Sequence, residues 1–193
     1  MADWIAALEP RAPDVVAAWR GIEAGAFLSV RREVRKRAGA GSTAAIVPQL
    51  AATADALMEI VRALPDAAFR ESGGEGDWNV AEAIGHDADS RAGLALAASL
   101  AAIGRFPADA KPVVPGVPGQ PDATREELLH RLARSQRLVD RAARSVAAHE
   151  LDPCPLDHPW VGRLRCGEWL LFVGVHDLMH LEQLHTLASR WGS

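Results

Sequence analysis

The stretch from residue 167 to residue 190, GEWLLFVGVHDLMHLEQLHTLASR, decides the fold class of this chain. Its apolar residues recur every three or four positions, which is typical of a helix with one face in a protein core. On a helical wheel the stripe contains Trp169, Phe172, Val173, Leu184 and Leu187. His176 and His180 fall in the middle of this stripe. Buried imidazoles need partners, so the two histidines require an explanation.

The spacing of four between His176 and His180 stacks them one helical turn apart, as two imidazoles must be to share a metal ion. Gln183 continues the same row and could orient a ligand or reach a substrate. Two other interpretations remain open: the histidines could bond to backbone carbonyls in the core, or the segment could be a metalloprotease motif. The protease is disfavoured because Asp177 is one methylene shorter than the glutamate base of that motif.

A third ligand must come from another helix, and His86 is the natural candidate. Asn79 and Glu82 form a capping-box pattern that predicts a helix start, which places His86 two turns into that helix. The other histidines considered have no comparable local context: His130, His149 and His158.

Five stretches are expected to form helices, and none is a convincing strand: 14–37, 46–64, 79–104, 124–146 and 167–190. The fourth also opens with a capping box, Thr124 to Glu127. Between the third and fourth, the segment 107–121 contains five prolines and cannot be regular helix or central strand. Such a long connector can run the length of a helical bundle and join two parallel helices.

The expected first helix, 14–37, carries its own apolar stripe, which includes Trp19, Ile22, Phe27 and Val30, and ends in a basic run, taken as a solvated last turn. The last helix has a second apolar face opposite the histidines, made by Leu171, Val175, Leu178 and Leu181. Either the N-terminal helix or a second subunit could cover that face.

Bulk properties favour an ordinary soluble protein. The chain has 193 residues, 49% hydrophobic residues and a formal net charge of -4, so no basic field predicts binding to nucleic acid or an anionic membrane. No apolar stretch approaches the roughly 18–20 residues of a membrane-spanning helix, and the N-terminus lacks the layout of a signal peptide. Two cysteines, Cys154 and Cys166, are too few for a disulfide framework, so a cytoplasmic location is expected.

Residues 77–86, DWNVAEAIGH, and residues 158–183, from His158-Pro159-Trp160 to Gln183, resemble the two signatures of the DinB-like, or YfiT-like, superfamily. The resemblance covers about residues 45–190. It implies an all-α four-helix bundle with up-down-down-up topology, whose long crossover falls on 107–121. It also implies that His86, His176 and His180 bind a metal. The bundle would span 44–193, after an N-terminal helical extension at 1–43.

One departure from the family pattern concerns the last helix. Arg165 stands where the family usually has a threonine or serine cap, so this helix could start differently.

Three neutral imidazoles suit a divalent ion of zinc, nickel or iron, of which zinc or nickel is expected here, and leave one coordination position open. The resemblance implies a metal-dependent transferase that joins a low-molecular-weight thiol, of the mycothiol or bacillithiol type, to an electrophile. A metal-dependent hydrolase and a non-catalytic, stress-related metal-binding dimer remain alternatives, and turnover itself stays open. A homodimer is expected, and Asp89 and Glu182 are the acids considered as a nearby acid or base.

Overall fold

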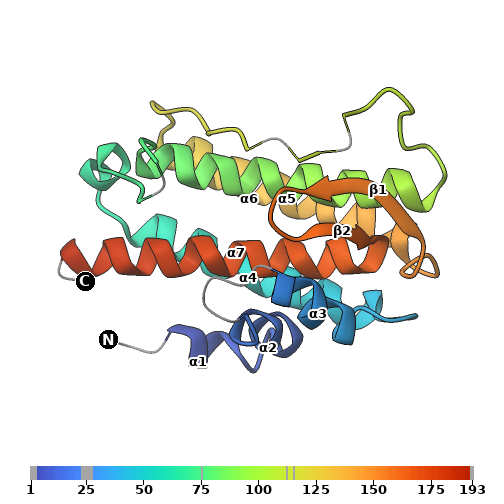
Figure 1. Cartoon of the computed structure of the whole chain (residues 1–193). Coiled ribbons are helices and arrows are strands. Elements are labelled where there is room, and N and C mark those ends of the chain that lie inside the picture. Colours follow the sequence, from blue (N-terminus) through green and yellow to red (C-terminus); the bar gives the residue numbers. More distant parts are fainter. Residues whose placement is uncertain (1–3, 23–27, 75, 112, 115, 192–193) are drawn as a thin grey trace.

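Four long helices form the frame of the structure, a computed structural model that describes residues 4–22, 28–74, 76–111, 113–114 and 116–191. They are α4 (Thr43–Ala63), α5 (Val80–Ala102), α6 (Arg125–Val146) and α7 (Cys166–Ala188). Figure 1 shows α5 and α6 running in one direction and α4 and α7 in the other. This is the expected all-α bundle with up-down-down-up topology.

The starts of the long helices confirm the capping signals in the sequence. Asn79 precedes α5 and Thr124 precedes α6, and each forms a complete capping box with the glutamate three residues later. At the start of α7, Arg165 has no side-chain acceptor to cap the helix, and only its backbone N–H bonds to the Glu168 carboxylate, at 2.9 Å. The predicted start, at about Gly167, agrees with the structure to within one residue, since α7 begins at Cys166.

The connector between α5 and α6 runs back along α5, as parallel neighbours require (Figure 1). The Gly119 N–H bonds to the Glu82 carbonyl at 2.9 Å, so the connector touches the α5 backbone directly. A Cβ added to Gly85 would lie only 2.8 Å from the Gly119 Cα. Glycine at both positions therefore permits this close approach. Two of its prolines, Pro112 and Pro115, lie outside the described residues.

The N-terminal segment is not one helix from 14 to 37, as the sequence analysis expected. It forms three short helices in the described residues: α1 (Trp4–Leu8), α2 (Pro13–Arg20) and α3 (Leu28–Arg37). Gly21 ends α2, and Phe27 lies outside the described residues. The reason is packing: with the helix broken, α2 and α3 contact each other and both contact α7. Val15 and Val34, one from each helix, are completely buried.

The expected basic run at the end of α3 is only partly solvated. Arg35 donates to the Glu168 carboxylate at 2.8 Å, which ties α3 to the first turn of α7. Glu33 accepts ion pairs from Lys36 and Arg37 on the same helix. The pairs of Glu33 stay within α3, whereas the Arg35 contact with Glu168 makes the basic run part of the attachment of the N-terminal segment to the bundle.

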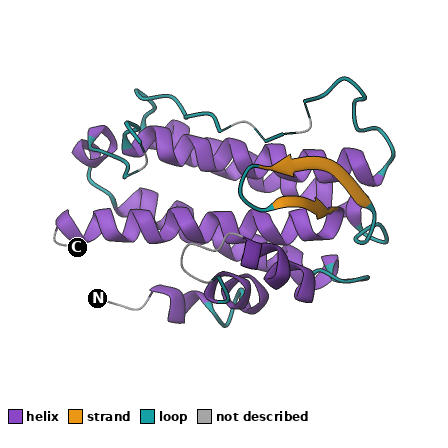
Figure 2. Ribbon diagram, viewed as in Figure 1, coloured by secondary structure: helices purple, strands orange, loops and turns teal. Residues whose placement is uncertain are grey.

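The expectation of no strand is wrong. A small antiparallel hairpin, β1 (Pro153–His158) and β2 (Gly162–Arg165), precedes α7 and lies over α5 and α7 (Figure 2). Burial alternates along β1, with Cys154 and Leu156 inward. The Val114 N–H of the connector bonds to the Asp157 carbonyl at 2.9 Å, so the connector and hairpin meet. Prolines interrupt the short alternation, which hid this hairpin in the sequence.

Helix α4 is more apolar than the sequence analysis recognised. By length and composition it could cross a membrane, yet half of the relevant window is buried inside the protein. It packs against α6 and α7, and its residues Ile46, Leu50, Leu57 and Val61 are buried in the core. Its apolarity is therefore that of a core helix.

The two cysteines, Cys154 and Cys166, are free and buried.

Candidate metal centre

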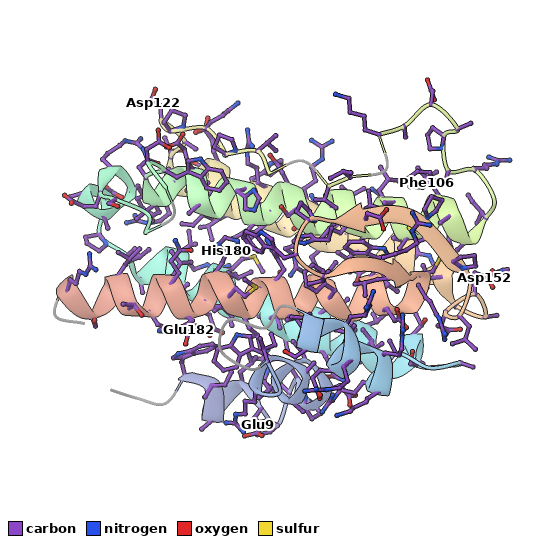
Figure 3. The ribbon with its side chains drawn as sticks, in the orientation of Figure 1. Glu9, Phe106, Asp122, Asp152, His180 and Glu182 are labelled. Carbon is purple, nitrogen blue, oxygen red and sulfur yellow. The ribbon has the colours of Figure 1, made fainter. Side chains whose placement is uncertain are left out.

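Three histidines meet between α5 and α7. His176 and His180 lie one turn apart on α7, and His86 comes from the second turn of α5. Their ligand atoms all lie within 4.8 Å of one another. The ring centre of His86 is 5.4 Å from each of the other two, and Figure 3 places His180 between the two helices. The structure thus brings the three expected ligands together from opposite sides of one interface.

The close approach of the connector to α5 fixes the orientation of His86. Because Gly85 and Gly119 lie against each other, the connector backbone passes beside the next residue, His86. The His86 Nδ1 atom lies 2.7 Å from the Val117 carbonyl oxygen. A carbonyl can only accept, so Nδ1 must carry the hydrogen of the neutral ring. The Nε2 atom of His86 therefore keeps its lone pair for a ligand bond.

The two histidines of α7 have matching arrangements. The Nδ1 of His176 lies 3.2 Å from the Asp87 carboxylate, and the Nδ1 of His180 lies 3.1 Å from the Gln183 side-chain oxygen. The Gln183 amide nitrogen donates to the Gly73 carbonyl, which fixes the amide so that its oxygen faces His180. Each histidine thus has an acceptor at Nδ1 and is prepared to bind through Nε2, as in established metal sites.

Burial keeps the two rings of α7 in the neutral form that binds metals. Burial, together with the charges of neighbouring histidines, lowers the pKa of His176 to about 3 and that of His180 to about 4. Neutral imidazoles are metal ligands, whereas imidazolium ions have no lone pair to donate. At neutral pH these two rings therefore need no proton loss before binding.

A buried charged layer lies behind the histidines. Arg91 of α5 is completely buried and pairs with Asp177 of α7, which also accepts a hydrogen bond from Thr53 of α4 at 2.5 Å. Burial raises the pKa of Asp87 and of Asp177, and the Arg91 guanidinium opposes both rises. This layer joins α4, α5 and α7 beside the candidate ligands, so it rigidifies the interface that carries them.

A pocket of about 480 Å³ opens beside the three histidines. Its walls come from α5, α7, the connector and the hairpin, and they are mostly apolar: Trp78, Leu94, Val114, Pro159, Trp160, Phe172 and Met179. Among the described residues that line it, none is an aspartate, glutamate, lysine or arginine. The pocket thus offers a largely uncharged space next to the candidate metal ligands, in the size range of small-molecule sites.

Comparison with protein families matches residues 49–184 to the DinB superfamily. The match covers more than half of the chain and contains all three histidines. The chain belongs to the DinB superfamily. Searches of curated proteins and of solved structures each gave no match.

Within this DinB-superfamily protein, the family match begins inside α4 and ends near the end of α7. Helices α1 to α3 precede the matched residues. They cover the apolar face of α7 opposite the histidines, where a Cβ on Gly174 would lie 2.8 Å from Val15 of α2. The cover for that face thus comes from the chain itself. The division of the chain into an N-terminal extension, 1–43, and a bundle domain, 44–193, stays a prediction.

The acids expected near the site are elsewhere in this DinB bundle. Asp89 pairs with Arg131 on the surface, and Glu182 is exposed on α7. The acids that do contact the centre or its supporting layer are Asp87 and Asp177. Asp177 bonds to Arg91 and does not line the pocket, so it does not stand where a metalloprotease base would. The sequence offered one signal for Asp87, its place directly after His86.

Sequence reasoning also missed a fourth histidine at the pocket. His158, at the end of β1, lines the pocket together with His86, His176 and His180. The sequence analysis assigns His158 no role because it has no local context comparable with that of His86, and the hairpin that carries it was not expected. His130 is exposed on α6, and His149 pairs with Asp152 at the surface.

Proposed function

We propose that this protein is a metal-dependent transferase that uses a low-molecular-weight thiol, of the mycothiol or bacillithiol type, with zinc or nickel held by His86, His176 and His180. The observation that carries the metal site is the shared orientation of the three rings, each with an acceptor at Nδ1. A divalent ion bound by three neutral nitrogens would keep its full positive charge and lower the pKa of a bound thiol or water.

The pocket supports a thiol over water as the nucleophile. Among its described lining residues no carboxylate is present, so a carboxylate base that could take a proton from an attacking water is missing there. A thiol needs less help, because its ordinary pKa of about 8.5 is far closer to neutrality than that of water. The apolar walls suit the electrophile that such a transfer would consume.

The thiol must come from outside the protein. Both cysteines are buried, and burial raises the pKa of the Cys166 thiol to about 12 and that of Cys154 above its ordinary value. Neither cysteine lines the pocket. A small external thiol would be abundant in the cytoplasm, where we place the protein and where free cysteines persist.

The test is to measure metal content and thiol binding in the same samples. We expect near-stoichiometric zinc or nickel in the wild type and its loss in His86→Ala, His176→Ala and His180→Ala, with His130→Ala as an exposed control that keeps its metal. Cobalt-substituted protein titrated with mycothiol, bacillithiol or glutathione should develop sulfur-to-cobalt charge-transfer absorption.

Each of three other results would contradict this proposal. Unchanged metal content in the triple substitution would mean that the histidines are not the ligands. A metal without a thiol band but with ester or amide hydrolysis would favour the hydrolase. A metal with neither activity would favour a non-catalytic, stress-related metal-binding dimer.

A further inference from the structure

His158 lies in the pocket without belonging to the histidine cluster. It ends β1, and its ring packs against Phe172 of α7, with ring centres 5.3 Å apart. Phe172 in turn lies between it and His176, 6.4 Å from the latter. His158 therefore faces the same cavity as the three candidate ligands, from the hairpin side.

The hydrogen bonding of His158 is the reverse of that of the other three rings. The backbone N–H of Trp160 donates to its Nδ1 atom at 3.2 Å. Since Nδ1 accepts, it carries no hydrogen, and the neutral ring must carry its hydrogen on Nε2. Burial and the charge of His86 lower the pKa of His158 to about 4, which agrees with a neutral ring that can accept this bond.

Besides the indole N–H groups of Trp78 and Trp160, the pocket contains few other side chains that could bind a polar atom of a ligand. The Gln183 side-chain amide already forms hydrogen bonds with the Gly73 carbonyl and with the His180 Nδ1 atom. The Ser90 hydroxyl lies 3.4 Å from the His86 Nε2 atom. In the described part of the chain, no acceptor lies within hydrogen-bond distance of the His158 Nε2 atom. The neutral His158 ring thus adds an N–H donor to the mostly apolar lining of the pocket, beside the candidate metal ligands.

We propose that the His158 Nε2–H binds an acceptor oxygen of the electrophilic substrate, and that this substrate is a mainly apolar molecule with one carbonyl oxygen. The reaction itself rests on the proposed function; the binding does not. An apolar body suits the walls formed by Trp78, Trp160 and Phe172. A carbonyl oxygen matches the neutral donor, and at the His158 wall no lysine or arginine among the described lining residues is available to pair with a carboxylate or phosphate.

Two fluorinated ligands of the same shape test the proposal. 4-Fluoroacetophenone has the carbonyl oxygen, and 1-ethyl-4-fluorobenzene has a methylene in its place. Fluorine NMR titration of the zinc-loaded protein should show the ketone binding about three- to ten-fold more tightly, the range expected for one hydrogen bond. His158→Phe keeps the ring volume, removes the donor and should abolish the preference without changing the zinc content. His158→Gln should restore part of it, and His130→Phe should leave it intact.

The tautomer can be measured in the wild type alone, which removes any dependence on how the variants fold. Long-range proton–nitrogen NMR of histidine-labelled protein should show hydrogen on Nε2 and none on Nδ1 of His158. The opposite tautomer, equal binding of both ligands, or a ketone preference that survives in His158→Phe would each overturn the proposal. An absent thiol–cobalt band with an intact ketone preference would instead overturn thiol transfer alone.

Discussion

The two sides of α7 are buried by different means. The apolar side, with Leu171, Gly174, Val175 and Leu178, faces α2 and α4 and is covered by aliphatic side chains. The polar side, with His176, Asp177 and His180, faces α5 and is covered by partners with defined hydrogen bonds. Both sides are largely buried, but only the polar side requires one specific partner for each side chain.

This difference separates what stabilises the fold from what the site can do. Apolar contacts tolerate exchange of one aliphatic residue for another of similar volume, so the apolar side constrains shape more than identity. A buried charge or imidazole without its partner costs free energy, so the polar side constrains identity as well. The polar side is therefore where a functional requirement best explains the residues.

The largest effect is expected from breaking the buried ion pair on the polar side. Asp177→Ala leaves Arg91 charged and unpaired in a site with no exposure, which should lower the free energy of unfolding of the metal-free protein by about 3–5 kcal/mol. Urea unfolding measures this. Asp89→Ala, which breaks the exposed pair with Arg131, is the matched control and should cost at most about 1 kcal/mol. Equal losses in the two variants would show that the Arg91 pair is not buried in solution.

A second, more gradual effect is expected from acid. The pKa values of His176 and His180 lie at about 3 and about 4 in the fold, against an ordinary value of 6.5. Below pH 6.5 the two histidines become protonated in the unfolded chain but stay neutral in the folded chain. Their contribution to the free energy of unfolding is therefore complete above pH 6.5 and falls as the pH drops toward 4. The slope is about 1.4 kcal/mol per pH unit for each proton.

Most of this acid sensitivity should come from the polar side, and a smaller share from His158, whose pKa burial also lowers to about 4. In metal-free protein, the double substitution of His176 and His180 by leucine should therefore reduce the loss of stability between pH 6.5 and pH 5, measured by urea unfolding at each pH. His130→Leu, at an exposed position on α6, should keep the wild-type slope. An unchanged slope in the double variant would mean that other groups cause the acid sensitivity.

The sequence was sufficient for the parts of the molecule governed by periodicity and capping. The stripe around His176 predicted α7, and Asn79 with Glu82 predicted the start of α5 to the residue. The prolines of the connector correctly indicated parallel α5 and α6. These features depend on contacts within a few residues, so the local sequence contains most of the necessary information.

The sequence was insufficient where contacts join distant segments. Arg91 is unremarkable as one residue of a helix, and only the packing of α4, α5 and α7 makes it a buried partner of Asp177. The break after Gly21 depends on the packing of both α2 and α3 against α7, which lies far away in the sequence. His158 reaches the pocket through a hairpin whose short, proline-interrupted strands give no clear alternation.

The smallest expected effects come from two glycines, one for each side of the comparison. A Cβ at Gly174 would lie 2.8 Å from Val15 and Leu50 on the apolar side, where the neighbours are side chains that can shift. Gly174→Ala should therefore cost about 1–3 kcal/mol through overpacking, reduced by the better helix propensity of alanine, and leave metal affinity unchanged.

Gly85→Ala tests the other side. Its Cβ would meet the backbone of Gly119, so the connector must move and the Val117 carbonyl must withdraw from His86. Loss of that acceptor should lower zinc affinity by about ten-fold or more, measured by competition with a chelator. Urea unfolding of both variants without metal gives their structural cost. If Gly174→Ala weakened zinc binding as much as Gly85→Ala, the two sides of α7 would be coupled, and the acceptor at Nδ1 would not be what prepares His86 to bind.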